Sequence, residues 1–94
     1  MKDYDTLIEE IVTMIGLFSI VDSDDEIEVG FNSHRDANGK RHCIALVRVG
    51  TITPYTSECY PTTFEALQAL HAEVRESVET RVKDFNKLFT APAN

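Results

Sequence analysis

The sequence is poor in the residues that mark several classes of protein. Its 94 residues include no tryptophan, two cysteines, four glycines and three prolines. Two cysteines are too few for the disulfide framework of a small secreted domain, and so little glycine and proline excludes collagen and most low-complexity chains. No apolar run is long enough, and free enough of charge, to cross a bilayer. These absences predict one small globular domain over residues 1–94.

Basic residues are also scarce, and they are unevenly placed. Nine lysines and arginines stand against 16 acidic residues, which gives a net charge of −7. The first 30 residues hold nine acidic residues and one lysine, whereas residues 31–57 hold four basic residues and one aspartate. The middle third is therefore a basic island between acidic flanks. The acidic start also lacks the basic and apolar regions of a secretory signal, so we expect a cytoplasmic protein with reduced thiols.

Apolar residues that recur every three or four positions predict a helix at each end of the chain. We expect the first helix to run from Asp3 to about Phe18, with Asp3 or Asp5 as its N-cap and Gly16 as its C-terminal stop. In an alternative interpretation, residues 17–21 form an extra strand. The second helix is expected over residues 63–89 and is opened by a capping box.

The second helix is longer than a small sheet can cover. Its 27 residues span roughly 40 Å, whereas a strand of eight residues spans about 27 Å. The apolar positions near its end extend past such a sheet, and we expect them to form the interface of a two-fold homodimer. These positions are Val78, Val82, Phe85, Leu88 and Phe89. In the alternative, the first helix and the chain end cover them within a monomer.

Three strands are expected between the helices. Residues 26–32 alternate between apolar and polar, residues 42–49 are apolar on both faces, and residues 52–60 include Pro54, which confines that strand to an edge or a bulge. Residues 36–39 read Asp-Ala-Asn-Gly, a turn signal. The predicted fold is α+β in the order α-β-β-β-α, with two helices on one face of a three-stranded antiparallel sheet.

The residues that could carry metal or catalytic chemistry do not form a known pattern. The candidate zinc ligands are His34, His42, Cys43, Cys59 and His71. Their spacing matches neither C-x-x-C nor H-x-x-x-H, the patterns typical of zinc sites. The sequence contains no G-x-S-x-G elbow and no glycine-rich phosphate loop. We therefore expect no metal, no cofactor and no enzymatic activity. Cys43 and Cys59 are expected to lie near each other across two strands as buried thiols, and whether they pair is left open.

Basic side chains bracket the predicted turn at residues 36–39. His34 and Arg35 precede it, and Lys40 and Arg41 follow it, with His42 next. These residues are expected to cluster at a hairpin tip, where they could contact phosphate or an acidic patch on another protein. The other interpretation is a solvated, charged tip that discourages pairing between sheet edges.

The order of elements resembles that of double-stranded RNA-binding domains. Those domains carry a lysine-rich start to the final helix, whereas here that start reads Thr62-Thr63-Phe64-Glu65-Ala66-Leu67. The RNA-binding residues therefore do not carry over. The three strands followed by Thr62-x-x-Glu65-Ala66-Leu67 look like HicB-type antitoxins and short phage or prophage proteins. In its small size and its acidity the chain is similar to phage-encoded inhibitors of host defence.

The leading hypothesis from the sequence is a small acidic binding protein without catalytic activity that acts through protein–protein contact. The resemblance implies an inhibitor of a host protein, encoded by a phage or mobile element. One alternative is a nucleic-acid or nucleotide binder that uses the hairpin tip, although the net charge of −7 disfavours this. Another is a structural subunit of a homo-oligomer.

Overall fold

The computed structural model describes residues 2–17 and 26–90, with the backbone alone at residues 17, 85 and 88–90. Its elements follow one another along the chain as α1 (Tyr4–Leu17), β1 (Ile27–Arg35), β2 (Arg41–Val49), β3 (Ile52–Thr56) and α2 (Thr63–Thr90). The strands form one antiparallel sheet in the order β1-β2-β3. This arrangement confirms the predicted α-β-β-β-α fold.

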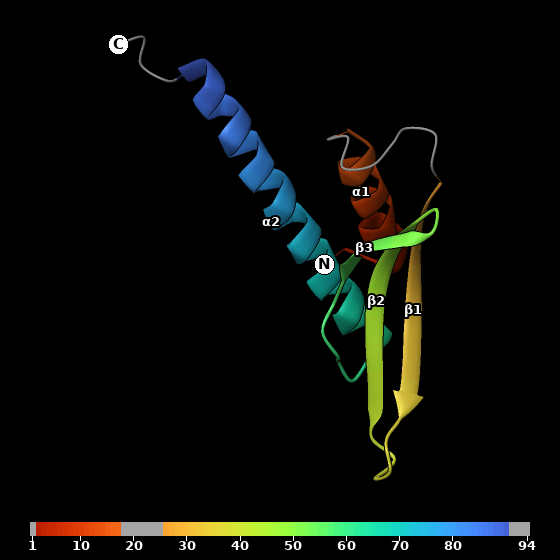
Figure 1. Cartoon of the computed structure of the whole chain (residues 1–94). Helices are drawn as coiled ribbons and strands as arrows, with labels where there is room; N and C mark the ends of the chain where they lie inside the picture. The colour runs from red at the N-terminus through yellow and green to blue at the C-terminus, as the bar shows by residue number, and fades with distance from the viewer. Residues whose placement is uncertain (1, 18–25, 91–94) are drawn as a thin grey trace.

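The two helices lie on the same side of the sheet (Figure 1). α1 packs against β1, and α2 packs against β2, β3 and α1. Alternate residues of a strand point to opposite faces, so every second residue of β2 faces the helices. These residues are at most 1% exposed, and they are Cys43, Ala45, Val47 and Val49. One face of the central strand is therefore buried in the core beneath the two helices.

Apolar stripes on both helices complete the core. α1 contributes Leu7, Ile11 and Ile15, and α2 contributes the stripe that contains Leu67, Leu70 and Val74. The spacings of three and four residues bring each set onto one helix face, as predicted. The other face of β2 is also partly apolar, because Leu46 is buried between Gly30 of β1 and Thr56 of β3 in the sheet register.

The start of α1 is capped as expected, but its predicted stop is wrong. The backbone N–H of Thr6 donates to Asp3 Oδ1 at 2.9 Å, and this bond lowers the pKa of Asp3. Gly16 belongs to the helix, which continues to Leu17. The preceding residue, Ile15, is fully buried in the core, and its packing favours the helical turn there. Leu17 in α1 argues against an extra strand from that position, and residues 18–21 lie outside the described residues.

The β1–β2 hairpin closes through the predicted turn. Oδ1 of Asp36 accepts the backbone N–H groups of Asn38 and Lys40, both at 2.9 Å. Gly39 has φ of 78°, a conformation that favours glycine. Both strands extend beyond their predicted ends, β1 to Arg35 and β2 from Arg41. Arg35 and Arg41 therefore form the last pair of the ladder, and Lys40 belongs to the turn side of it.

The third strand is shorter than predicted. It ends at Thr56, and Tyr60 forms only an isolated bridge with Cys43. The register shifts between Val47 and Val49. The Oγ of the buried Ser57 then accepts the N–H of Ala45 at 2.9 Å, so a side chain takes the place of a strand carbonyl. β3 is an edge strand, as Pro54 requires.

Candidate functional site

The structure brings the predicted basic residues together at the tip of the β1–β2 hairpin. Arg35 lies directly opposite Arg41 in the register, and His34 lies directly opposite His42. Residues opposite each other share a face, so the two arginines lie on one side of the ribbon and the two histidines on the other. The histidine rings stack with their centroids 5.2 Å apart. Lys40, which precedes Arg41 in the chain, is exposed.

Asp36, the single acidic residue of this tip, is occupied by the turn itself. Nε2–H of His42 donates to Asp36 Oδ2 at 2.9 Å, while Oδ1 accepts the N–H groups of Asn38 and Lys40. The bond from His42, followed by that from Lys40, lowers the pKa of Asp36. The carboxylate is therefore ionised near neutral pH, and its hydrogen bonds go to the turn and His42 rather than to the arginines.

The second predicted surface is the distal segment of α2, which we define as residues 78–90. α2 leaves the sheet and α1 and projects away from the body of the protein (Figure 1). Val78 is 7% exposed, whereas Val82, one helical turn later, is 36% exposed. The cover supplied by the described residues thus ends between these two positions.

The distal segment carries all five predicted interface residues. Val78 is buried against the core, and Val82 is exposed. The positions of Phe85, Leu88 and Phe89 are helical, and their side chains lie outside the described part of the structure. By spacing, residues 78, 82, 85 and 89 follow one stripe of the helix.

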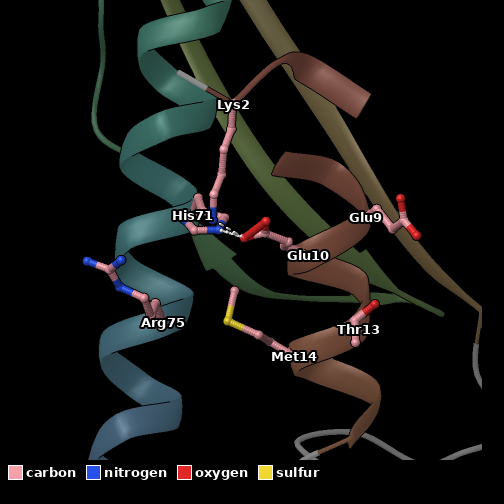
Figure 2. A pocket seen from close by; sticks show the side chains of 7 residues that line it. All are labelled: Lys2, Glu9, Glu10, Thr13, Met14, His71 and Arg75. Carbon is pink, nitrogen blue, oxygen red and sulfur yellow. Dashed lines mark hydrogen bonds and ion pairs between the residues drawn. The ribbon is translucent and has the colours of Figure 1, made fainter. Parts of the chain in front are cut away.

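A third site lies between the two helices. It is polar, and it was not predicted from the sequence. His71 is only 7% exposed, and its Nε2–H donates to Glu10 Oε1 at 3.0 Å. Lys2 Nζ donates to the same oxygen at 2.6 Å. Figure 2 shows His71 of α2 and Glu10 of α1 pointing toward each other in an open hollow that Met14 and Arg75 also line.

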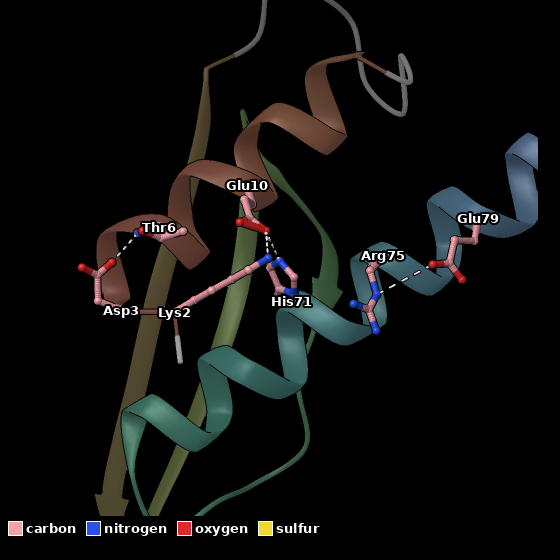
Figure 3. A network of polar contacts seen from close by, with 7 residues as sticks. All are labelled: Lys2, Asp3, Thr6, Glu10, His71, Arg75 and Glu79. Atoms are coloured by element: carbon pink, nitrogen blue, oxygen red, sulfur yellow. Dashed lines mark hydrogen bonds and ion pairs between the residues drawn. The ribbon is translucent and has the colours of Figure 1, made fainter.

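A sequence signal for this contact was present. His71 lies four residues after Leu67 and three before Val74, so it shares their buried stripe. By residue type alone, His71 is a candidate zinc ligand, and this contact gives it a structural partner instead. The salt bridge between Arg75 and Glu79 lies farther along α2 and is exposed (Figure 3).

The Glu10 contacts predict a pH dependence of stability. The hydrogen bond from Lys2, and then that from His71, lowers the pKa of Glu10 below its ordinary value of 4.5. A carboxylate with a lowered folded-state pKa stabilises the fold above its unfolded value, and this contribution is lost as the pH falls through the folded-state pKa. The Glu10→Gln variant should be less stable than the wild type near neutral pH, and the difference should shrink in acid.

Urea unfolding at about pH 7 and about pH 3 measures this difference. Glu9→Gln is the matched control, because Glu9 is an exposed neighbour on the same helix. The control should show a smaller difference that does not follow the titration of Glu10. A Glu10→Gln deficit of the same size at both pH values would contradict the prediction.

The prediction that Cys43 and Cys59 form a pair of buried thiols is wrong. Cys43 is buried and Cys59 is exposed, and both are free. Cys43 lies opposite Tyr60 rather than Cys59, and adjacent strand residues point to opposite sides. The Cys43 thiol donates to the Pro61 carbonyl at 3.7 Å. The irregular segment between Thr56 and Tyr60 therefore moves the residue opposite Cys43 along by one.

Within the described part of the chain, no cluster of three or more histidine, cysteine or carboxylate side chains has the geometry to hold a metal ion. No helix over residues 2–17 and 26–90 combines the length and the apolar character that a bilayer crossing requires. Comparison with protein-family models, curated proteins and solved structures finds no match to this chain. The resemblance to HicB-type and phage proteins stays a prediction.

Proposed function

We propose that this chain is a small binding protein without catalytic activity, which assembles as a two-fold homodimer through the distal segment of α2. The observation that carries the proposal is that, among the residues the structure describes, the cover of α2 ends between Val78 and Val82 while the apolar stripe continues. An apolar stripe that continues past its cover is typical of an interface.

The dimensions of the helices explain why α1 does not cover this segment. α2 has 28 residues and is about 42 Å long, whereas α1 has 14 residues and is about 21 Å long. The principal extents of the molecule are 61 × 27 × 25 Å, so α2 adds a projecting arm to a small body. A second copy of the arm can bury what α1 cannot reach.

The charges of the distal segment favour a second copy as the occupant. Among residues 78–90 two acidic residues, Glu79 and Asp84, stand against three basic residues. The segment is therefore nearly neutral with both signs present, although the whole chain carries −7. Two copies of it can approach without the repulsion that the rest of the surface imposes, and opposite charges can meet across the seam.

The wider role that we propose is contact with a target protein. The resemblance to HicB-type proteins and to phage-encoded inhibitors of host defence supports a phage or mobile-element inhibitor. A cytoplasmic location fits the two free cysteines, because thiols persist in a reducing compartment.

Sedimentation equilibrium at micromolar concentration tests the dimer. We expect the wild type to sediment as a dimer and the Phe85→Glu variant as a folded monomer, because a charge in the apolar seam is costly to bury. Thr80→Glu is the matched control. It adds the same charge about 160° around the helix from the stripe, at an exposed position, and should stay dimeric.

A monomeric wild type would contradict the dimer itself. A Phe85→Glu variant that stays folded and dimeric would place the contact elsewhere, on the open face of the sheet. Circular dichroism of each variant shows whether α2 is still helical, which separates a lost interface from a lost helix.

A further inference from the structure

We infer that the tip of the β1–β2 hairpin is a binding site for a phosphate group, which Arg35 and Arg41 hold between them. The two arginines face each other across the last pair of the ladder. The tip lies at the end of the molecule opposite the far end of α2 (Figure 1), so this site is separate from the proposed dimer contact.

The arginine pair places two like charges opposite each other, an arrangement that a bound anion would stabilise. Directly opposed residues in an antiparallel ladder have Cβ atoms about 4.5–5.5 Å apart, and like charges in such positions destabilise the pair. In the described part of the chain, no carboxylate oxygen lies within 4.0 Å of the charged side-chain nitrogens of Arg35, Lys40 or Arg41. An anion bound between the guanidinium groups would remove the repulsion.

The hydrogen bonds of the turn keep the site open and partly organised. Asp36 would be the natural internal counter-ion, but its two oxygens are bonded to Asn38, Lys40 and His42. Nη1–H of Arg35 donates to the Gly39 carbonyl at 3.1 Å, which positions its guanidinium over the turn. A guanidinium presents several donors in a planar fork, the geometry that phosphate oxygens match.

The net charge of −7 does not prevent binding at this tip. Exposed charges are largely screened beyond a Debye length, which is about 8 Å at physiological salt. Glu28 lies seven residues before Arg35 on β1, about 23 Å along the strand. The acidic start of α1 is nearer, because Tyr4 packs against Phe31, four residues and about 13 Å from Arg35. At the tip itself Arg35, Lys40 and Arg41 outnumber Asp36, so the tip carries a local excess of positive charge.

The shape of the site favours a phosphate on a nucleic-acid backbone. A projecting two-stranded ribbon has the width that the major groove of a duplex admits. Arg35, Lys40 and Arg41 at its end supply phosphate contacts, which bind without reading sequence. Free phosphate offers the same chemistry without the groove, and an acidic protein segment offers carboxylates instead.

Chemical-shift titration of the isotope-labelled protein with a duplex DNA of mixed sequence tests the site. We expect the backbone amide signals of the turn, residues 35–41, to shift at the lowest DNA concentrations.

Arg41→Gln should weaken binding about tenfold or more. It should also lower, by about one, the slope of a plot of the logarithm of the binding constant against the logarithm of the salt concentration. Arg48→Gln is the matched control, because Arg48 is exposed on the same strand seven residues away. It should leave both quantities unchanged.

Inorganic phosphate and an oligo-glutamate peptide complete the experiment. Phosphate should shift the same amides more weakly than the duplex does, which supports a backbone contact. Equal weakening by Arg41→Gln and Arg48→Gln would overturn the site, because the attraction would then be diffuse. Tighter binding of oligo-glutamate than of the duplex would overturn the phosphate assignment, and the absence of shifts at the turn with every probe would overturn the site altogether.

Discussion

The Leu67→Ala and Leu70→Ala variants should each lose about 2–5 kcal/mol of the free energy of unfolding. Both leucines are fully buried on the face of α2 that covers the sheet. Truncation removes apolar contacts with β2 and leaves a cavity that the rigid sheet cannot fill. A domain of this size has a total stability of about 5–15 kcal/mol, so the loss is a large fraction of it.

Chemical denaturation followed by circular dichroism measures the loss as a lower midpoint. Gln68→Ala is the control on the same helix, because Gln68 is exposed between the two leucines. It should change stability by no more than about 0.5 kcal/mol. A leucine variant that unfolds at the wild-type midpoint would contradict the assignment of this stripe to the sheet.

The Val47→Asp variant should fail to fold. Val47 is fully buried in the central strand and pairs with Val29 of β1 and Tyr55 of β3. An aspartate there would place a carboxylate among apolar side chains, with no basic partner in the hydrophobic cluster around it. The cost of burying an unpaired charge exceeds about 4 kcal/mol, which is comparable to the whole stability of a small domain.

Thr56→Asp is the matched control for Val47→Asp. Thr56 lies opposite Leu46 on the face of the sheet that the helices do not cover, and its side chain is exposed. This variant should give the dispersed amide spectrum of a folded protein, whereas Val47→Asp should give a collapsed one. A well-dispersed spectrum of Val47→Asp would mean that the buried face of the sheet is the other one.

The two proposed surfaces have a joint consequence. They lie at opposite ends of the molecule, so a dimer formed through α2 would carry two hairpin tips (Figure 1). Two linked phosphate contacts bind more tightly than one whenever both can engage the same nucleic acid. Phe85→Glu would then weaken binding to a long duplex without changing the tip.

The sequence by itself determined the features that depend on near neighbours in the chain. Apolar spacing predicted both helices, because residues three and four apart share a helix face. The Asp36 and Gly39 turn follows from a short polar side chain and a residue without Cβ. In the same way, Thr62 caps α2, since its Oγ1 accepts the N–H of Glu65 at 3.2 Å. These local features were enough to predict the order of elements and the basic hairpin tip.

Only the tertiary structure decided the features that depend on contacts between distant segments. The bond between His71 and Glu10 joins residues 61 positions apart, and no local rule pairs them. The irregular segment between Thr56 and Tyr60, where the hydroxyl of Ser57 accepts the N–H of Ala45, decided that Cys43 meets Tyr60 rather than Cys59. The end of the cover on α2 likewise depends on where α1 and the sheet stop. Alternation and spacing show which face a residue occupies, but the register and the extent of packing decide what it meets there.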